Sequence, residues 1–214
     1  MSEPNGPPPP PGLLGSREIY RGRIVHLTVD RVRFPDGSTG ELEMIRHRGA
    51  SAVLPVVGSL GDSDPDVLLL RQYRYAAGGE LYEVPAGMRA GVDESWEACA
   101  RRELEEETGH RAGNLIPLTH IYTTPGFTDE VIHLFLASEL TEGSAALDTD
   151  EFLEVVRVPF STALAWVREG RIVDAKSIST LLYAGMFVSG MGEKLSSLTG
   201  ENVIKKGREG EEMA

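Results

Sequence analysis

The sequence contains one cysteine, Cys99, among its 214 residues. A single thiol can form neither an intramolecular disulfide nor a cysteine-based zinc site, and it fits a reducing compartment, so we expect a cytoplasmic protein. No apolar run is close to the length of about 18 residues that a membrane-spanning helix needs. The polar, proline-rich first residues do not have the pattern of a signal peptide. We therefore expect no membrane partner.

Positive charge is also scarce. Lysine and arginine number 21 against 33 acidic residues, which gives a formal net charge of −12. A general nucleic-acid binder needs a basic surface, so we expect no nucleic-acid partner. A small phosphorylated ligand remains compatible with this charge, because a few arginines or a bound metal ion can supply a local positive field.

The distribution of proline and charge suggests four segments. We expect residues 1–15 to be a disordered proline-rich arm and 205–214 to be a charged tail. Residues 16–48 are expected to form an N-terminal β subdomain, and 49–204 a single catalytic domain.

The hydrophobic pattern indicates an α+β fold. Residues 24–34 and 41–47 alternate apolar and polar side chains around the turn sequence PDGSTG, which predicts an N-terminal antiparallel hairpin or sheet. Residues 51–57 and 66–74 are more continuously apolar, as buried strands are. Strands outnumber helices and do not alternate with them, so we expect a mixed sheet with helices packed on it.

One predicted helix, over residues 93–108, carries an unusual charge pattern. Asp93 can cap its start and Gly109 can end it. At 100° per residue, Trp96 and Cys99 begin an apolar stripe that faces a sheet. The same stripe continues into Glu103, Glu106 and Glu107.

Carboxylates on an inward face cannot all ionise without a counterion. A divalent cation is the natural one, because Mg²⁺ takes carboxylate oxygens and bridges to substrate phosphates. The alternative is a structural protein whose acidic helix only improves its solubility, and failure to bind any divalent metal would favour it.

The helix and its approach carry a spaced motif, ESWEACARRELEEETG, that begins at Glu94. It closely resembles the box of the Nudix hydrolases, which implies a Nudix-type α/β/α sandwich. Two positions depart from that box. Six residues instead of five separate Gly87 from Glu94, and His110 replaces an aliphatic residue. Both lie outside the expected metal ligands.

The resemblance also implies roles for individual residues. Glu103 and Glu107 match the principal metal ligands, and Glu106 matches a further ligand or the base that activates water. The carbonyl of Ala86 matches a backbone ligand, and Arg102 the residue that orients the glutamates. The metal is expected to be Mg²⁺, with Mn²⁺ or another divalent cation as the alternative.

Other segments resemble the ADP-ribose pyrophosphatase branch. Pro125, fifteen residues after His110, lies in a loop TTPGFTDE that is typical of this branch. By analogy, Arg74 binds the diphosphate, Glu83 lies close to the terminal ribose, and Pro125 is expected to contribute to substrate binding. The alternative for Arg74 is an exposed partner of a surface acid.

A late acidic loop of that branch supplies a carboxylate near the attacking water. Glu151 aligns best with this carboxylate, and Asp150 second. The expected substrate is a small nucleoside diphosphate derivative, most simply ADP-ribose, which would be split into AMP and ribose 5-phosphate. Another nucleotide sugar such as GDP-mannose, or a non-catalytic sensor that binds ADP-ribose, remains an alternative.

The branch is commonly dimeric, with the N-terminal sheet of one subunit covering the site of the other. We expect a homodimer in which residues 20–48 close the partner's adenosine pocket, since an isolated hairpin is marginal in water. The alternative is a monomer whose hairpin packs on its own subunit.

Overall fold

The computed structural model describes residues 12–145, 153–188 and 191. These residues form two compact units. The first contains the described residues up to Gly49 together with Tyr122–Val131, and the second contains Ala50–Ile121 with the described residues from Ile132 onward. The N-terminal unit therefore includes a segment that lies far along the sequence, which a division into contiguous ranges does not capture.

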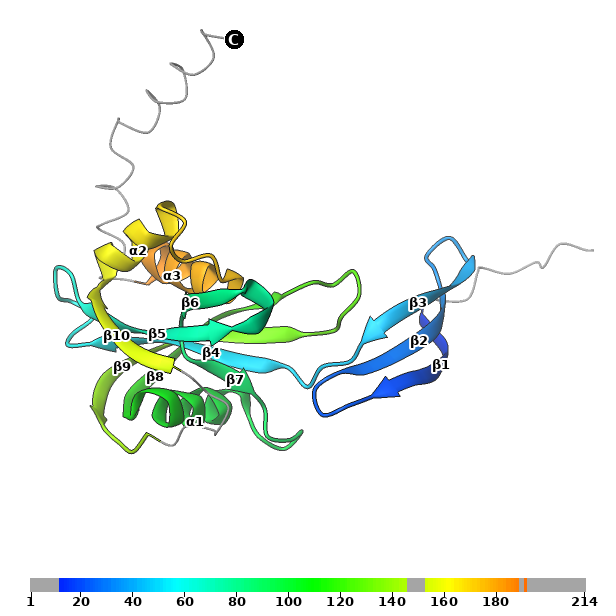
Figure 1. The fold of residues 1–214 in the computed structure, drawn as a ribbon, viewed down its shortest axis with the longest axis horizontal. Helices are drawn as coiled ribbons and strands as arrows, with labels where there is room; N and C mark the ends of the chain where they lie inside the picture. The colour runs from blue at the N-terminus through cyan, green and yellow to red at the C-terminus, as the bar shows by residue number, and fades with distance from the viewer. Residues whose placement is uncertain (1–11, 146–152, 189–190, 192–214) are drawn as a thin grey trace, which may run out of the picture. The chain divides into compact units, whose positions relative to one another are not determined.

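The N-terminal unit is built on a three-stranded antiparallel sheet of β1 (Gly12–Arg21), β2 (His26–Arg33) and β3 (Thr39–Ile45), with β2 in the centre (Figure 1). Strand β1 begins at Gly12, inside the range assigned above to a disordered arm, and that part of the expectation is corrected. Leu13 pairs with Val32 on the neighbouring strand. This pairing is non-local, and the local proline-rich composition does not reveal it.

The segment Tyr122–Val131 is fastened to the end of β3. The amide of Ile45 donates to the carbonyl of Phe127 at 2.7 Å, and the amide of Asp129 donates to the carbonyl of Ile45 at 3.4 Å. Arg46 adds an ion pair to Asp129, with 3.0 Å between Nη1 and Oδ2. Backbone and charged contacts thus attach the Pro125 loop to the N-terminal unit.

The second unit is a seven-stranded mixed sheet. Its main path runs β10-β5-β4-β9-β8, with β6 paired to β5 and β7 paired to β4. Strands β4 and β9 are parallel, whereas the other registered pairs in this sheet are antiparallel. The strands are β4 (Ala50–Val57), β5 (Asp66–Arg74), β6 (Gly79–Glu83), β7 (Ala86–Met88), β8 (His110–Tyr122), β9 (Val131–Glu142) and β10 (Leu153–Pro159), and a short 3₁₀ helix spans Tyr75–Ala77.

Helices cover both faces of this sheet (Figure 1). Helix α1 (Trp96–Thr108) packs through Leu104 on one face, against Val53 of β4. Helices α2 (Phe160–Arg168) and α3 (Ala175–Phe187) pack on the other face, against alternate residues such as Leu54. The predicted α+β sandwich with a mixed sheet is confirmed. No helix in the described part of the chain is long and apolar enough to span a membrane.

Helix α1 starts later than its sequence suggests. Its N-cap is Ser95, whose hydroxyl accepts a hydrogen bond from the amide of Ala98 at 3.1 Å, and not Asp93. Both residue types cap helices well, so the preference alone could not separate two candidates two residues apart. Gly109 ends the helix as expected, with a left-handed φ of 69° that favours glycine.

The position of the cap can be tested with two variants. Ser95→Ala removes the hydroxyl that satisfies an amide of the first turn, so we expect it to lower the free energy of unfolding by about 1 kcal/mol. Asp93→Ala is the matched control and should change stability by less than about 0.5 kcal/mol, as for an ordinary surface position. Urea unfolding followed by circular dichroism would measure both. The opposite ranking would contradict the assigned cap.

Candidate active site

The site begins where the chain leaves β6 and enters α1. Strand β7 pairs with β4 through Ala52 and Ala86, and the carbonyl of Pro85 accepts a hydrogen bond from the amide of Val53 at 2.9 Å. The short strand is thereby held to the centre of the sheet. The backbone of Ala86 and Gly87 consequently lies beside the last turns of α1.

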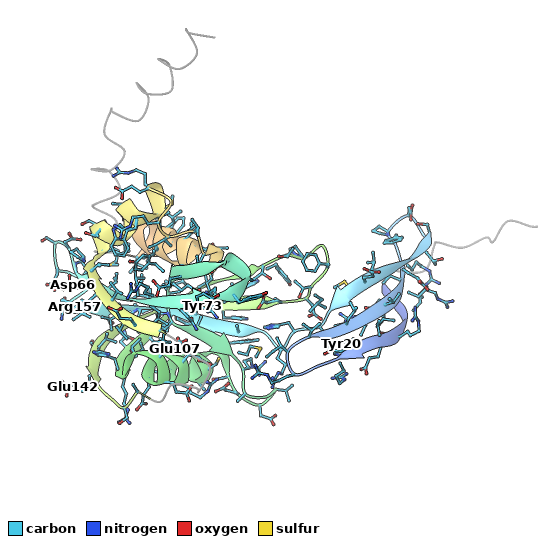
Figure 2. The ribbon with its side chains drawn as sticks, in the orientation of Figure 1. Tyr20, Asp66, Tyr73, Glu107, Glu142 and Arg157 are labelled. Atoms are coloured by element: carbon cyan, nitrogen blue, oxygen red, sulfur yellow. The ribbon has the colours of Figure 1, made fainter. Side chains whose placement is uncertain are left out.

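Two carboxylates of α1 are buried against this backbone. Glu103 is 8% exposed and Glu107 is 4% exposed, and Glu107 lies between α1 and the strands (Figure 2). The amide of Ala86 donates a hydrogen bond of 2.9 Å to Oε2 of Glu107. A Cβ atom at Gly87 would lie 2.1 Å from Oε1 of Glu103, so only glycine leaves room for this carboxylate.

Arg102 joins the acidic residues of the motif. Its Nη1 donates to Oε1 of Glu103 at 2.7 Å and to Oε2 of Glu106 at 2.9 Å. Its Nε and Nη2 donate to the two oxygens of Glu94 at 2.9 and 3.1 Å. The hydrogen bond to Glu94, followed by the other carboxylates, raises the pKa of Arg102. One guanidinium therefore fixes three carboxylates, as an orienting residue must.

The donor atoms here suit a hard divalent cation. Glu103 and Glu107 lie one helical turn apart on the buried face and border the backbone of Ala86 and Gly87, so the available ligands are oxygens, as Mg²⁺ prefers. Within the described residues, no three His, Cys, Asp or Glu side chains form a group that could hold a metal ion. Both Glu103 and Glu106 accept a hydrogen bond from Nη1 of Arg102. A metal here would use a carboxylate pair and backbone oxygen.

A second charged cluster surrounds Glu83, which is 2% exposed. Arg74 binds it in a bidentate manner, with Nε to Oε1 at 2.7 Å and Nη2 to Oε2 at 2.8 Å. Lys176 of α3 donates to the same Oε2 at 2.5 Å. Burial alone would raise the pKa of Glu83, but the hydrogen bonds and charges of Arg74 and Lys176 outweigh it and lower the pKa.

Arg74 also connects the two clusters. Its hydrogen bonds to Glu83 are the main cause of its raised pKa, and the charge of Glu107 contributes to the same shift. Among the described residues, no hydrogen bond occupies its Nη1, and the side chain is 41% exposed. Glu83 thus holds the guanidinium in a fixed orientation while one edge remains available for an anion.

The remaining predicted residues are distributed differently. Pro125 is exposed in the loop that belongs to the N-terminal unit. Glu151 and Asp150 lie outside the described residues. These assignments to substrate and water remain predictions.

Sequence reasoning missed the contribution of α3. Lys176 lies between Glu83 and Asp174, and Asp174 caps the helix by accepting a hydrogen bond of 3.0 Å from the amide of Ser177. Aspartate is a preferred N-cap residue, and Asp174 before an apolar-periodic stretch would have placed the helix start before Lys176. It would not have revealed Glu83 as the partner.

Comparison with known proteins identifies the family of this chain. The NUDIX domain model matches residues 46–180, and a model described as the nucleoside diphosphate sugar hydrolase N-terminal domain matches 13–41. A solved structure described as an ADP compounds hydrolase superposes with a TM-score of 0.71 and covers 88% of this chain and 99% of that chain. At 23% identity, that likeness shows the fold alone.

Three curated relatives illustrate the range of similar proteins. The ADP-ribose pyrophosphatase of Bacillus subtilis is 37% identical over 172 residues, which cover 79% of this chain and 90% of that protein. The methanol dehydrogenase activator of Bacillus methanolicus is 37% identical over 173 residues, with the same two coverages. The GDP-mannose pyrophosphatase of Yersinia enterocolitica is 39% identical over 127 residues, covering 55% of this chain and 65% of that protein.

The domain match spans well over half of the chain, and the residues that it covers include the buried carboxylates, the glycine that makes room for one of them, and the arginine that binds them. Nudix enzymes generally use a divalent metal ion, and the oxygen donors described above fit one. The chain belongs to the Nudix hydrolase family.

Proposed function

We propose that this enzyme hydrolyses the pyrophosphate bond of ADP-ribose to AMP and ribose 5-phosphate in the presence of Mg²⁺. The observation that carries the proposal is that Arg74, whose Nη1 edge has no hydrogen-bond partner among the described residues, lies near enough to buried Glu107 for their charges to interact, while Glu103 is buried one helical turn from Glu107. Carboxylates suit a metal ion, and a guanidinium suits a phosphate. Binding and hydrolysis of a diphosphate require both a metal ion and a cationic side chain.

The choice of ADP-ribose rests on the length of the alignment, which covers 79% of this chain for the Bacillus subtilis enzyme. The Bacillus subtilis ADP-ribose pyrophosphatase aligns over 90% of its own length, whereas the GDP-mannose pyrophosphatase aligns over 65%. The longer alignment supports a shared substrate, and the loop around Pro125 resembles that branch. GDP-mannose remains the second candidate because its pyrophosphatases are equally similar within the part that aligns.

The proposed chemistry divides among the residues as follows. A bound Mg²⁺ supplies neutralisation of the diphosphate charge and lowers the pKa of a coordinated water. Glu103, Glu107 and the carbonyl of Ala86 would hold the metal, and Arg102 would keep the carboxylates in place. Glu106 is proposed as a further ligand or as the base.

The other roles concern substrate and water. Arg74 would bind the diphosphate, and Glu83, which orients Arg74, is proposed to lie near the terminal ribose. Glu151 is proposed to position or deprotonate the attacking water, with Asp150 as the alternative. The water would lose a proton to this carboxylate as its oxygen bonds to one phosphorus atom, and the bridging P–O bond would break with the bridging oxygen leaving on the other phosphate.

A substrate panel tests the reaction directly. We expect ADP-ribose to give the highest kcat/KM among ADP-ribose, ADP-glucose and GDP-mannose, with AMP and ribose 5-phosphate as products. Adding EDTA should stop turnover, since the carboxylates alone cannot neutralise a diphosphate. Chromatography of the products measures both expectations. Binding of ADP-ribose without release of AMP at saturating Mg²⁺ would instead indicate a sensor.

The metal ligands can be tested at Glu107. Glu107→Gln keeps the shape of the side chain and an acceptor for the amide of Ala86, but removes one charge. We expect a loss of kcat of at least about 10²-fold, the scale for a key electrostatic group. The stabilisation of the protein by Mg²⁺ in thermal unfolding should also decrease.

The matched control for this change is Glu105→Gln. Glu105 lies on the same helix, but it points to Arg111, with 2.8 Å between Nε and Oε1. Its loss should leave kcat and the response to Mg²⁺ unchanged. Near-normal turnover of Glu107→Gln at saturating Mg²⁺ would refute the ligand assignment.

We also propose a homodimer formed through the N-terminal sheet. Both hydrophobic core clusters of the described chain draw only on the second unit. The N-terminal sheet nevertheless carries a cross-strand row of Tyr20, Leu27 and Ile45 on one face and exposed Leu42 on the other, with Tyr20 labelled in Figure 2. A sheet without an apolar core of its own is stabilised by packing on a second copy, where it could close the partner's adenosine pocket.

The dimer is tested by charging both faces of this sheet. The double variant Tyr20→Glu/Leu42→Glu should be monomeric at micromolar concentration in analytical ultracentrifugation, because each change buries a charge in the proposed interface. Met186→Glu, at an exposed apolar position of α3, is the control and should remain dimeric.

Deletion of residues 1–48 extends the same test. It should abolish both dimerisation and activity although Glu103 and Glu107 remain. An interface made by an exchanged sheet should bury more than about 2,000 Å². A wild-type protein that is monomeric and fully active at micromolar concentration would contradict the proposal.

A further inference from the structure

Lys176 is a nearly buried lysine that no part of the Nudix motif explains. Its side chain is 12% exposed, and its Nζ lies 2.5 Å from Oε2 of Glu83 and 3.0 Å from Oδ2 of Asp174. A buried ammonium group is costly unless its charge is paired, so these two contacts account for its position. They do not account for why a lysine is placed beside a carboxylate that Arg74 already neutralises.

The four side chains form a row of alternating charge. Asp174 and Lys176 come from the start of α3, Glu83 from the end of β6, and Arg74 from the end of β5. Each charge contacts the next, at distances of 3.0, 2.5 and 2.7 Å between Lys176 and Asp174, Lys176 and Glu83, and Arg74 and Glu83. The row starts with a carboxylate and ends with the guanidinium of Arg74.

This order leaves the positive end of the row at Arg74. Glu83 shares its negative charge between Arg74 and Lys176, so it does not neutralise Arg74 fully. Without Lys176, Glu83 and Asp174 would give the row a net charge of −1, close to Glu107, whose charge already acts on Arg74. Such a field disfavours an anion at Arg74.

The row is also tied to the backbone that leads into the carboxylate site. Ser177 donates from its hydroxyl to Oδ2 of Asp174 at 2.5 Å, and the same hydroxyl accepts from the amide of Val84 at 2.8 Å. Val84 directly follows Glu83 and is 1% exposed. The start of α3 therefore fixes the orientation of Glu83 through both its side chain and its backbone.

We propose that Lys176 is a positioning residue for substrate binding, which acts through Glu83 to keep the guanidinium of Arg74 aligned toward the diphosphate and offsets the negative charge of Glu83 and Asp174 beside it. The inference rests on the proposed function, because it takes Arg74 as the diphosphate ligand. Lys176 itself does not contact the substrate in this proposal.

The test compares Lys176→Gln and Lys176→Arg with the wild type. Lys176→Gln keeps a hydrogen-bond donor toward Glu83 but removes the charge. We expect KM for ADP-ribose to rise about tenfold, equivalent to about 1.4 kcal/mol, with kcat changed less than about twofold. The dissociation constant of inorganic pyrophosphate, measured by calorimetry in EDTA, should rise by the same factor. Lys176→Arg should restore both values.

Arg168→Gln is the matched control. It also removes one positive charge, but Arg168 lies at the exposed end of α2, with Glu169 at 3.9 Å. It should leave KM, kcat and pyrophosphate affinity unchanged. A merely structural role of Lys176 predicts a lower unfolding temperature and a lower kcat without this selective effect on KM, and that result would overturn the proposal.

A double-mutant cycle separates positioning from direct contact. If Lys176 acts through Arg74, Lys176→Gln should add little to the effect of Arg74→Ala on KM and on pyrophosphate affinity. Additive effects would overturn the proposal, because they would mean that Lys176 binds the anion independently.

The cycle also distinguishes this inference from the proposed function. An Arg74→Ala variant with unchanged KM and pyrophosphate affinity would refute the role of Arg74 and the inference together. If Arg74→Ala raises both values and Lys176→Gln raises neither, only the inference fails.

Discussion

Burial of Glu103 and Glu107 under α1 is the constraint on which the rest of the site depends. Neighbouring carboxylates that lose water repel each other, so the surrounding chain must supply compensation. The amide of Ala86 donates a hydrogen bond to Glu107, and the guanidinium of Arg102 donates one to Glu103. Gly87, which has no Cβ atom, leaves the space that Glu103 occupies. All three lie within the β7–α1 segment, so a change to any of them alters the environment of the same two carboxylates. This is a physical reason why the motif has fixed spacing.

The fold could be predicted largely where its signals were local. The periodicity of α1 gave the buried stripe that runs from Cys99 to Glu107, and both Glu103 and Glu107 are buried there. Its start was wrong by a few residues, because Asp93 and Ser95 are both good caps and tertiary packing decides between them. The start of β1 at Gly12 was missed because it depends on pairing with β2, which no local composition reports.

The candidate site divides in the same way. The carboxylates and Arg102 come from one helix, and sequence spacing alone brings them together. The row from Asp174 to Arg74 instead combines β5, β6 and α3. Arg74 and Lys176 lie far apart in the sequence, so residue spacing could not predict that both bind Glu83. The capping pattern at Asp174 was the only local sign of this part of the site. Sequence spacing thus predicted the grouping of the α1 carboxylates around Arg102, but it did not predict the charged row that holds Arg74.

The attachment of Tyr122–Val131 to the end of β3 has a consequence for how this protein could have arisen. The backbone crosses between the two units three times, after Gly49, after Ile121 and after Val131. A domain joined by one linker can be gained, lost or exchanged by a single genetic event. Here the N-terminal sheet contacts a loop, Tyr122–Val131, that is encoded between two parts of the second unit. A sheet taken from another protein would therefore keep these contacts only if it also carried a partner for Asp129 in the place of Arg46. The two units are therefore expected to be inherited together, with the sheet and the loop diverging as a pair.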